Sequence, residues 1–279
     1  REWHKNATTP LINLAIDKIK SGDVIVDYGS GTGGSAIELV KKLDNLSLDY
    51  KLILVDPLES WFSKAYSILK KRSNIFFCKS YGPNSQGQTS FLTLDELLGG
   101  NKVDLIISSS TIHLIPNNVL HSLFSEFYDN LSDKGKFIWS SGDIPSKLLP
   151  IGCNLLHDPY REILKQIRNN IQYCNFESGF DENSIIKMRK RADKIFPYSN
   201  DIDYYMDALH KSKFRGEVFT EIINKTVDEC KLFMKTPRLS EIASSINNLE
   251  IRAAFINKVI TSLFENSESD LVTRGEAYD

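Results

Sequence analysis

The sequence predicts an α/β protein with a doubly wound, mostly parallel sheet. Short runs of apolar, often β-branched residues alternate with helix-like segments through the first half of the chain. A glycine cluster follows the first of these runs, where nucleotide-binding sheets pass from a strand into a helix. The 279 residues, of which 41% are apolar and 25% charged, suit one such domain with a sizeable insertion.

The expected elements follow one another in regular order. Residues 9–19 have apolar side chains at helical spacing, and the Ser-Gly pair at 21–22 ends this first helix. Continuous apolar runs, typical of strands buried on both faces of a parallel sheet, predict strands at 24–26, 51–55, 75–78, 103–108 and 136–140. Helices are predicted between them, and a polar loop rich in turn-forming residues at 80–90. These helices cover residues 35–43, 61–71, 92–98 and 117–131.

The pattern changes after Asp143. Three helices without intervening strands predict a helical insertion over residues 144–212, which we expect to act as a lid over the substrate. Residues 1–143 and 213–279 are then the core. The three helices are predicted at 159–175, 182–195 and 201–211, followed by a strand at 217–227, helices at 228–235, 239–246 and 250–265, and a last strand at 270–278.

Composition narrows the classes of function. The formal net charge of −2 gives no basic field that would draw the protein to nucleic acid. The four cysteines form no CxxC pair, so neither a zinc site nor a disulfide framework is expected. No apolar run of about 18 residues predicts a membrane span, and the first residues lack an apolar signal core. We therefore expect a cytoplasmic protein without a metal.

The strongest functional signal is the segment 26–34, Val-Asp-Tyr-Gly-Ser-Gly-Thr-Gly-Gly. Glycine lets a backbone turn sharply and approach a ligand closely. Gly29, Gly31 and Gly34 satisfy the GxGxxG pattern of dinucleotide-binding proteins, and Asp56 stands where that pattern places its acidic residue. An NAD(P)-dependent oxidoreductase is therefore one alternative.

Asp27 argues against a dinucleotide. In dinucleotide folds the position two before the first glycine normally continues the buried, apolar strand. A carboxylate is costly to bury there unless a cationic or hydrogen-bond-donating group meets it. A ligand with an ammonium group would do so, whereas a pyrophosphate would be repelled. In the structural alternative, Asp27 bonds only to N–H groups of its own loop.

With these residues the sequence resembles the class I S-adenosylmethionine-dependent methyltransferases, which have a Rossmann-like fold. Asp27, Gly29, Gly31 and Gly33 match the family's first motif, an acidic residue followed by GxGxG, and Asp56 matches the acidic residue that ends its second strand. The resemblance implies S-adenosylmethionine (SAM) as cofactor, with its amino-acid end at Asp27 and its ribose hydroxyls at Asp56. It also implies a seven-stranded sheet with an antiparallel last strand.

The resemblance assigns a set of residues to the cofactor, all in or beside the carboxyl ends of the predicted strands. The family's adenine contact has no clean counterpart, since Lys79 and Ser80 follow the third strand directly. The residues expected to bind the cofactor are Asp27, Gly29, Ser30, Gly31, Gly33, Asp56, Pro57, Ser80, Ser108 and Ser109.

His113 is the candidate general base, because it follows the fourth strand closely and would stand near the methyl group. A base is needed only when the acceptor carries a proton. A histidine packed under the lid and bonded to the backbone is the structural alternative. The acceptor is expected to contact Trp3, Trp139, Tyr160 and Tyr204. Ordinary packing is the alternative for Trp139, Tyr160 and Tyr204, and a tag or a disordered segment is the alternative for Trp3.

The acceptor is predicted to be a small molecule. The (N/D)PP(Y/F) motif used to methylate base amines is absent at the fourth strand, where residues 108–111 read Ser-Ser-Ser-Thr. The layout resembles the trans-aconitate-type and, more loosely, the histamine-type enzymes. We favour an oxygen nucleophile, with N-methylation and a non-catalytic SAM-binding protein as alternatives. No nucleic-acid or membrane partner is expected, and a homodimer is a possible assembly.

Overall fold

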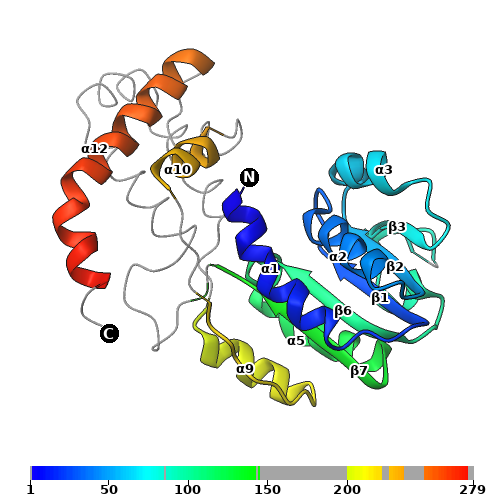
Figure 1. The fold of residues 1–279 in the computed structure, drawn as a ribbon. Coiled ribbons are helices and arrows are strands. Elements are labelled where there is room, and N and C mark those ends of the chain that lie inside the picture. Colours follow the sequence, from blue (N-terminus) through cyan, green and yellow to red (C-terminus); the bar gives the residue numbers. More distant parts are fainter. Residues whose placement is uncertain are drawn as a thin grey trace. The chain divides into compact units, whose positions relative to one another are not determined.

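The computed structural model describes residues 2–84, 86–142, 144, 200–221, 226–235 and 248–275 (Figure 1). The chain divides into two compact units, and the unit formed by Glu2–Ser141 and Asp201–Glu221 contains the main sheet. Helices α10 (Val227–Met234) and α12 (Leu249–Gly275) belong to the other unit, where they contact each other.

The main sheet has five strands in the order β3-β2-β1-β6-β7, and every neighbouring pair is parallel. The strand order reverses at β1, between β2 and β6, which is where doubly wound sheets bind their ligands. The predicted mostly parallel sheet is confirmed. Its strands are β1 (Asp23–Tyr28), β2 (Tyr50–Asp56), β3 (Ile75–Lys79), β6 (Val103–Ser109) and β7 (Leu131–Ser140).

Helices flank both faces of this sheet (Figure 1). One face is covered by α1 (Glu2–Ile16), α2 (Gly34–Asn45), η1 (Glu59–Phe62) and α3 (Ser63–Leu69). The helix predicted at 61–71 is therefore divided between η1 and α3. The helices of the other face are α4 (Leu94–Leu98), α5 (Asn117–Asn130) and α9 (Ile202–Lys211). The short helix η2 (Ile112–Leu114) follows β6. Within the predicted polar loop, β4 (Tyr81–Pro83) and β5 (Thr89–Phe91) form a small antiparallel hairpin.

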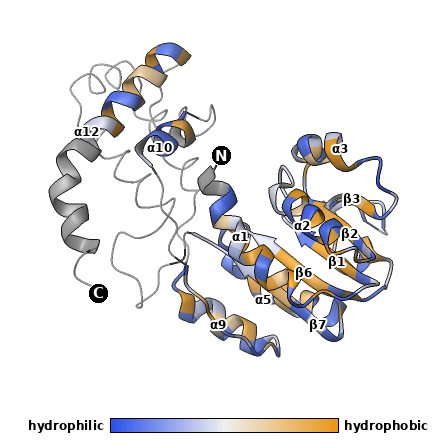
Figure 2. Cartoon of the chain, in the orientation of Figure 1, coloured by the Kyte–Doolittle hydropathy of each residue, from blue (hydrophilic) through white to orange (hydrophobic). Residues whose placement is uncertain are grey.

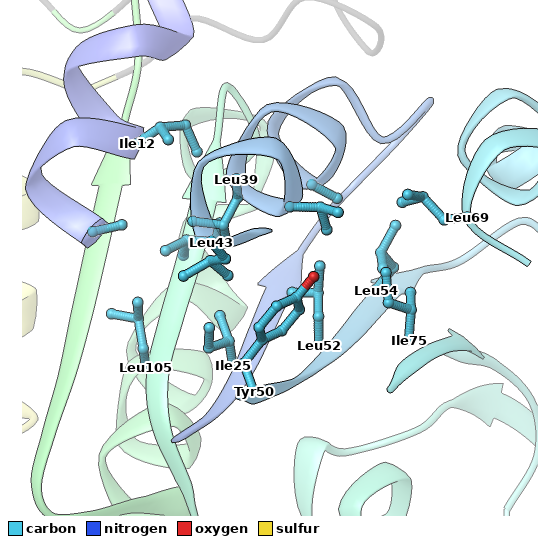
Figure 3. Close-up of a cluster of buried hydrophobic side chains, with 14 of the residues drawn as sticks. Ile12, Ile25, Leu39, Leu43, Tyr50, Leu52, Leu54, Leu69, Ile75 and Leu105 are labelled. Carbon is cyan, nitrogen blue, oxygen red and sulfur yellow. The ribbon is translucent and has the colours of Figure 1, made fainter. Parts of the chain in front are cut away.

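The first face is held by aliphatic packing. Alternate positions of the strands, such as Ile25, Leu52 and Leu105, point toward Ile12 of α1 and Leu39 of α2 (Figure 3). All five side chains are essentially fully buried, and each contributes roughly 1.5–3 kcal/mol by leaving water. Figure 2 shows the strands as the most hydrophobic part of this unit. The continuous apolar runs in the sequence thus reflect burial on both faces.

The other face is held by aromatic packing that includes α9. Phe137 of β7 contacts Phe127 of α5 and Phe214, which follows α9, with ring centroids 4.9 and 5.9 Å apart. The Ser212 hydroxyl also lies 3.0 Å from the His121 Nδ1 on α5. Helix α9 therefore packs within the unit that contains the main sheet.

Two predicted strands are wrong within the described residues. Residues 217–221 are irregular, and Val227 begins helix α10. Residues 270–275 continue α12, in which residues 249–274 contain neither glycine nor proline to end the helix. β-Branched residues at 217–227 suggested a strand, but Phe219 is 64% exposed rather than packed against a sheet formed by the described residues. The described part of the main sheet therefore has five strands rather than seven.

Part of the predicted lid cannot be compared with the structure. Residues 145–199, which include Tyr160 and two of the three predicted lid helices, lie outside the described residues. The third of those helices is confirmed as α9.

Candidate active site

The glycine loop joins β1 to α2 through a backbone that side chains would obstruct. Gly29, Gly31 and Gly33 have φ angles of +71°, +52° and +77°, in the left-handed region that favours glycine. A Cβ added at Gly29 would clash with the Thr111 side chain, and one at Gly33 would clash with Ala65. The loop therefore needs glycine both for its conformation and for its close packing.

Asp27 lies at the end of β1, directly before this loop, and is only 1% exposed. Neither of its carboxylate oxygens accepts a hydrogen bond within the described structure. Burial raises the pKa of Asp27 to about 7, and the nearby Asp56 adds to the rise. The Ala36 N–H offsets part of it, although its geometry falls short of a hydrogen bond. A buried carboxylate in this state favours a cationic ligand.

Asp56 ends β2 and holds the glycine loop in place. Its Oδ2 accepts a hydrogen bond from the Gly31 N–H at 2.9 Å, and its Oδ1 accepts one from the Leu58 N–H at 3.3 Å. Burial raises the pKa of Asp56, while these two N–H groups partly offset the rise. Ser30, in the same loop, buries its hydroxyl without a hydrogen-bond partner in the described structure. The loop thus presents several buried polar atoms that a ligand could satisfy.

The remaining predicted cofactor residues lie at the same edge of the sheet. Pro57 directly follows Asp56, and the N–H of the buried Ser80 donates to the Asp56 carbonyl at 2.9 Å. Ser108 is fully buried, and its hydroxyl donates to the Tyr28 carbonyl at 2.8 Å. Its side chain therefore supports the start of the glycine loop. Ser109, the last residue of β6, accepts a hydrogen bond from Thr111 through its carbonyl at 3.1 Å.

His113 lies in η2, shortly after the carboxyl end of β6. The side chain is 4% exposed, and its Nδ1 lies 2.9 Å from the Ser141 hydroxyl, just beyond β7. This contact fixes the orientation of the imidazole. The structure thus places the candidate base just after β6, the neighbour of β1 at the point where the strand order reverses.

Of the four predicted acceptor residues, two have side chains that the structure describes. Trp139 is half-buried and packs against Tyr205 of α9, with ring centroids 5.4 Å apart. Tyr204 is 38% exposed and contacts the same Tyr205 ring at 5.8 Å. Trp139 therefore takes part in the packing of α9 against the sheet. Tyr160 and the side chain of Trp3 lie outside the described residues.

Trp61 also lies beside the glycine loop, although its place in the sequence predicted only the start of a helix. Its indole is 47% exposed, and its Cε3 lies 3.9 Å from the position that a Cβ on Gly31 would occupy. The short turn after Asp56 brings it there. The sequence offers one indication of this position, namely that Trp61 shortly follows Asp56.

The described segments of the chain also bear on metal binding and on membrane insertion. These segments contain no group of three or more His, Cys, Asp or Glu side chains arranged to hold a metal ion. Within the same segments, no helix is both long and apolar enough to cross a membrane.

Comparison with known proteins identifies the family of the chain. No family model matches the chain. The carboxy-S-adenosyl-L-methionine synthase of Nautilia profundicola is 34% identical over 196 residues, which cover 67% of this chain and 70% of that protein. The chain belongs to the class I S-adenosylmethionine-dependent methyltransferase family. The family's cofactor, SAM, fits the unpaired Asp27 better than a dinucleotide does, so the NAD(P) alternative is set aside.

Solved structures show the same methyltransferase fold. A putative sarcosine dimethylglycine methyltransferase from Galdieria sulphuraria is similar with a TM-score of 0.52 and 14% identity, over 95% of this chain and 81% of that one. Mycolic acid cyclopropane synthase CmaA1, complexed with SAH, is similar with a TM-score of 0.50 and 16% identity, over 91% and 77% of the two chains. At these identities the likeness supports the fold.

Proposed function

We propose that this SAM-dependent methyltransferase transfers the methyl group to an oxygen atom of a small-molecule acceptor. The single observation that supports its cofactor site is the buried, unpaired carboxylate of Asp27. The amino-acid end of SAM carries an ammonium group that would pair with this carboxylate. Asp56 would accept hydrogen bonds from the ribose hydroxyls, at the end of the adjacent strand β2.

SAM supplies an already activated methyl group, which passes from sulfur to the acceptor oxygen as the sulfur keeps the bonding electrons. The protein's residues then mainly have to align the two partners, and alignment of this kind can lower the barrier by about 7–11 kcal/mol. A carboxylate acceptor carries no proton that must be removed. A hydroxyl acceptor does, and His113 is the residue we assign to take it.

The position of His113 suits an acceptor that loses a proton, such as a hydroxyl. Its imidazole is buried, anchored through Nδ1 to Ser141, and follows β6. With a hydroxyl acceptor, His113→Ala should lower kcat roughly 100-fold while leaving SAM binding within about twofold. With a carboxylate acceptor, the same substitution should leave kcat nearly unchanged.

A second candidate function comes from the relative in Nautilia profundicola. Its name says that it makes carboxy-S-adenosyl-L-methionine, and it is 34% identical to this chain. In that case a carboxylic-acid co-substrate would lose its carboxyl group to the methyl carbon of SAM, which would give up one proton to the co-substrate, and the chain would release the carboxylated SAM and the decarboxylated co-substrate.

Mass spectrometry on the purified full chain separates the two candidates. The chain is incubated with SAM and panels of carboxylic acids, hydroxyl compounds and amines. The proposal predicts stoichiometric formation of S-adenosylhomocysteine (SAH) and of an O-methylated acceptor. Methylation of amines alone would overturn the oxygen assignment. Conversion of SAM to a carboxylated form would establish the second candidate instead.

A further inference from the structure

The turn that follows β6 is fixed on its β7 side. Ser110 in this turn has a φ of +54°, a left-handed conformation that is uncommon for residues other than glycine. Its backbone N–H donates to the Ser140 carbonyl at the end of β7, 2.8 Å away. Such strain persists only where the surroundings impose it, and it is frequent at functional sites. Strand β7 therefore holds the turn in one conformation.

Thr111 fixes the same turn on its β1 side. Its hydroxyl lies 3.0 Å from the Gly29 carbonyl oxygen and 3.1 Å from that of Ser109, and can donate to either. Its side chain also fills the space in which a Cβ on Gly29 would stand. Ser108 donates to the preceding carbonyl, that of Tyr28. The two successive carbonyls that lead into the glycine loop thus both lie within hydrogen-bonding distance of hydroxyls from the β6 side.

We propose that Thr111 is a positioning residue that couples the glycine loop to the turn carrying His113. Its hydroxyl and methyl group set where Gly29 lies relative to β6, and His113 follows two residues later, held by Ser141. One turn therefore connects the loop at the cofactor's amino-acid end with the imidazole assigned to the acceptor. The role of His113 rests on the proposed function, whereas the coupling of Thr111 to the loop needs only cofactor binding.

Two substitutions separate the hydroxyl from the shape of this side chain. Thr111→Val keeps the branched shape and removes the hydroxyl, and should weaken SAH binding about tenfold through the loss of one partly buried hydrogen bond. Thr111→Ser keeps the hydroxyl and should bind within about threefold of wild type. Thr9→Val is the matched control, because the Thr9 hydroxyl also donates to a backbone carbonyl, that of Lys5, but within α1.

The readouts are SAH affinity by calorimetry and the thermal midpoint of the ligand-free full chain. The proposal predicts an affinity loss in Thr111→Val, rescue in Thr111→Ser, and unchanged SAH affinity in Thr9→Val, with Thr111→Val still folded at the temperature of the titration. Wild-type affinity in Thr111→Val overturns it, as does an equal loss in both variants. These measurements use SAH without an acceptor, so they are independent of which atom is methylated.

Hydrogen exchange on the wild-type chain keeps the proposal testable if Thr111→Val does not fold. The coupling predicts that SAH slows amide exchange in residues 110–113 as well as in the glycine loop. Slowed exchange in the loop alone overturns the coupling. Failure of wild type to bind SAH would contradict the cofactor assignment and the coupling together.

Discussion

At the scale of single residues, Asp27 is the most strongly perturbed charge of the proposed cofactor site. Its pKa is about 7, against an ordinary value near 4. Between about pH 4 and pH 7, Asp27 is therefore protonated in the folded chain and ionised in the unfolded chain. The free energy of unfolding therefore falls as pH rises through this range, by roughly 4 kcal/mol. Above pH 7 the folded chain buries the ionised, unpaired carboxylate, so this part of the free energy of unfolding is not regained.

Asp27→Asn should move stability and cofactor binding in opposite directions. Near pH 8 the amide removes a buried, unpaired charge, so we expect the free energy of unfolding to rise by about 1–3 kcal/mol. SAM affinity should fall at least tenfold, because the ammonium group loses its partner. Urea denaturation at about pH 5 and about pH 8 measures the first effect, which should nearly vanish at the lower pH. A loss of stability at pH 8 would contradict this prediction.

Cofactor affinity should itself depend on pH. Pairing with an ammonium group requires the carboxylate form of Asp27, so SAH should bind more tightly as pH rises from about 5.5 to about 8, with a slope approaching tenfold per pH unit below pH 7. Equilibrium dialysis across this range measures the dependence, and Asp27→Asn should flatten it. A wild-type affinity that is constant over the range would argue against pairing with Asp27.

At the scale of elements, the glycine loop combines conformational and steric requirements. Gly29 and Gly22 both have positive φ, but only Gly29 is packed, since nothing lies within 4 Å of a Cβ added at Gly22. Gly22→Ala therefore reports the conformational strain alone. Gly29→Ala adds a clash with Thr111 and should weaken SAH binding at least tenfold more than Gly22→Ala does. Equal SAH affinities in the two variants, measured by calorimetry, would show that the contact is unimportant.

The packing of α9 can be tested in the same way. Phe214→Ala removes ring contacts with Phe137 and Tyr128, and should lower the free energy of unfolding by about 1–3 kcal/mol. Hydrogen exchange in α9 should accelerate. Phe219→Ala, at a 64% exposed ring in the irregular segment, is the control and should change neither quantity measurably. Unchanged exchange in Phe214→Ala would mean that other contacts hold the helix.

The elements that could be predicted are those whose local sequence already reflects their surroundings. The central strands β1, β2 and β6 are largely buried, so each contains a nearly continuous apolar run, whereas the edge strands β3 and β7 are more exposed. The glycines of the loop are explained by its left-handed backbone conformation. Residues 217–227 and 270–278 gave only propensity signals, which tertiary context overrides. The positions of Trp61 and Thr111 depend on how turns after β2 and β6 fold back over the loop, which no periodicity records.

At the scale of the whole molecule, the sheet brings together residues that are far apart in the sequence. Parallel strands place Asp27, Asp56 and the turn before His113 at one edge, because β2 and β6 both pair with β1. The carboxylate at the end of β1 and that at the end of β2 suit the ammonium and the ribose of one extended cofactor. The family relationship identifies that cofactor as SAM.

The most direct test is a calorimetric titration of the full chain at about pH 8, well above the pKa of Asp27, with SAH and, in parallel, with NADH. We expect SAH to bind stoichiometrically, NADH to give no heat of binding, and Asp27→Asn to weaken SAH at least tenfold. Binding of NADH, or SAH binding that is indifferent to Asp27→Asn, would contradict the assignment of this buried carboxylate to the cofactor.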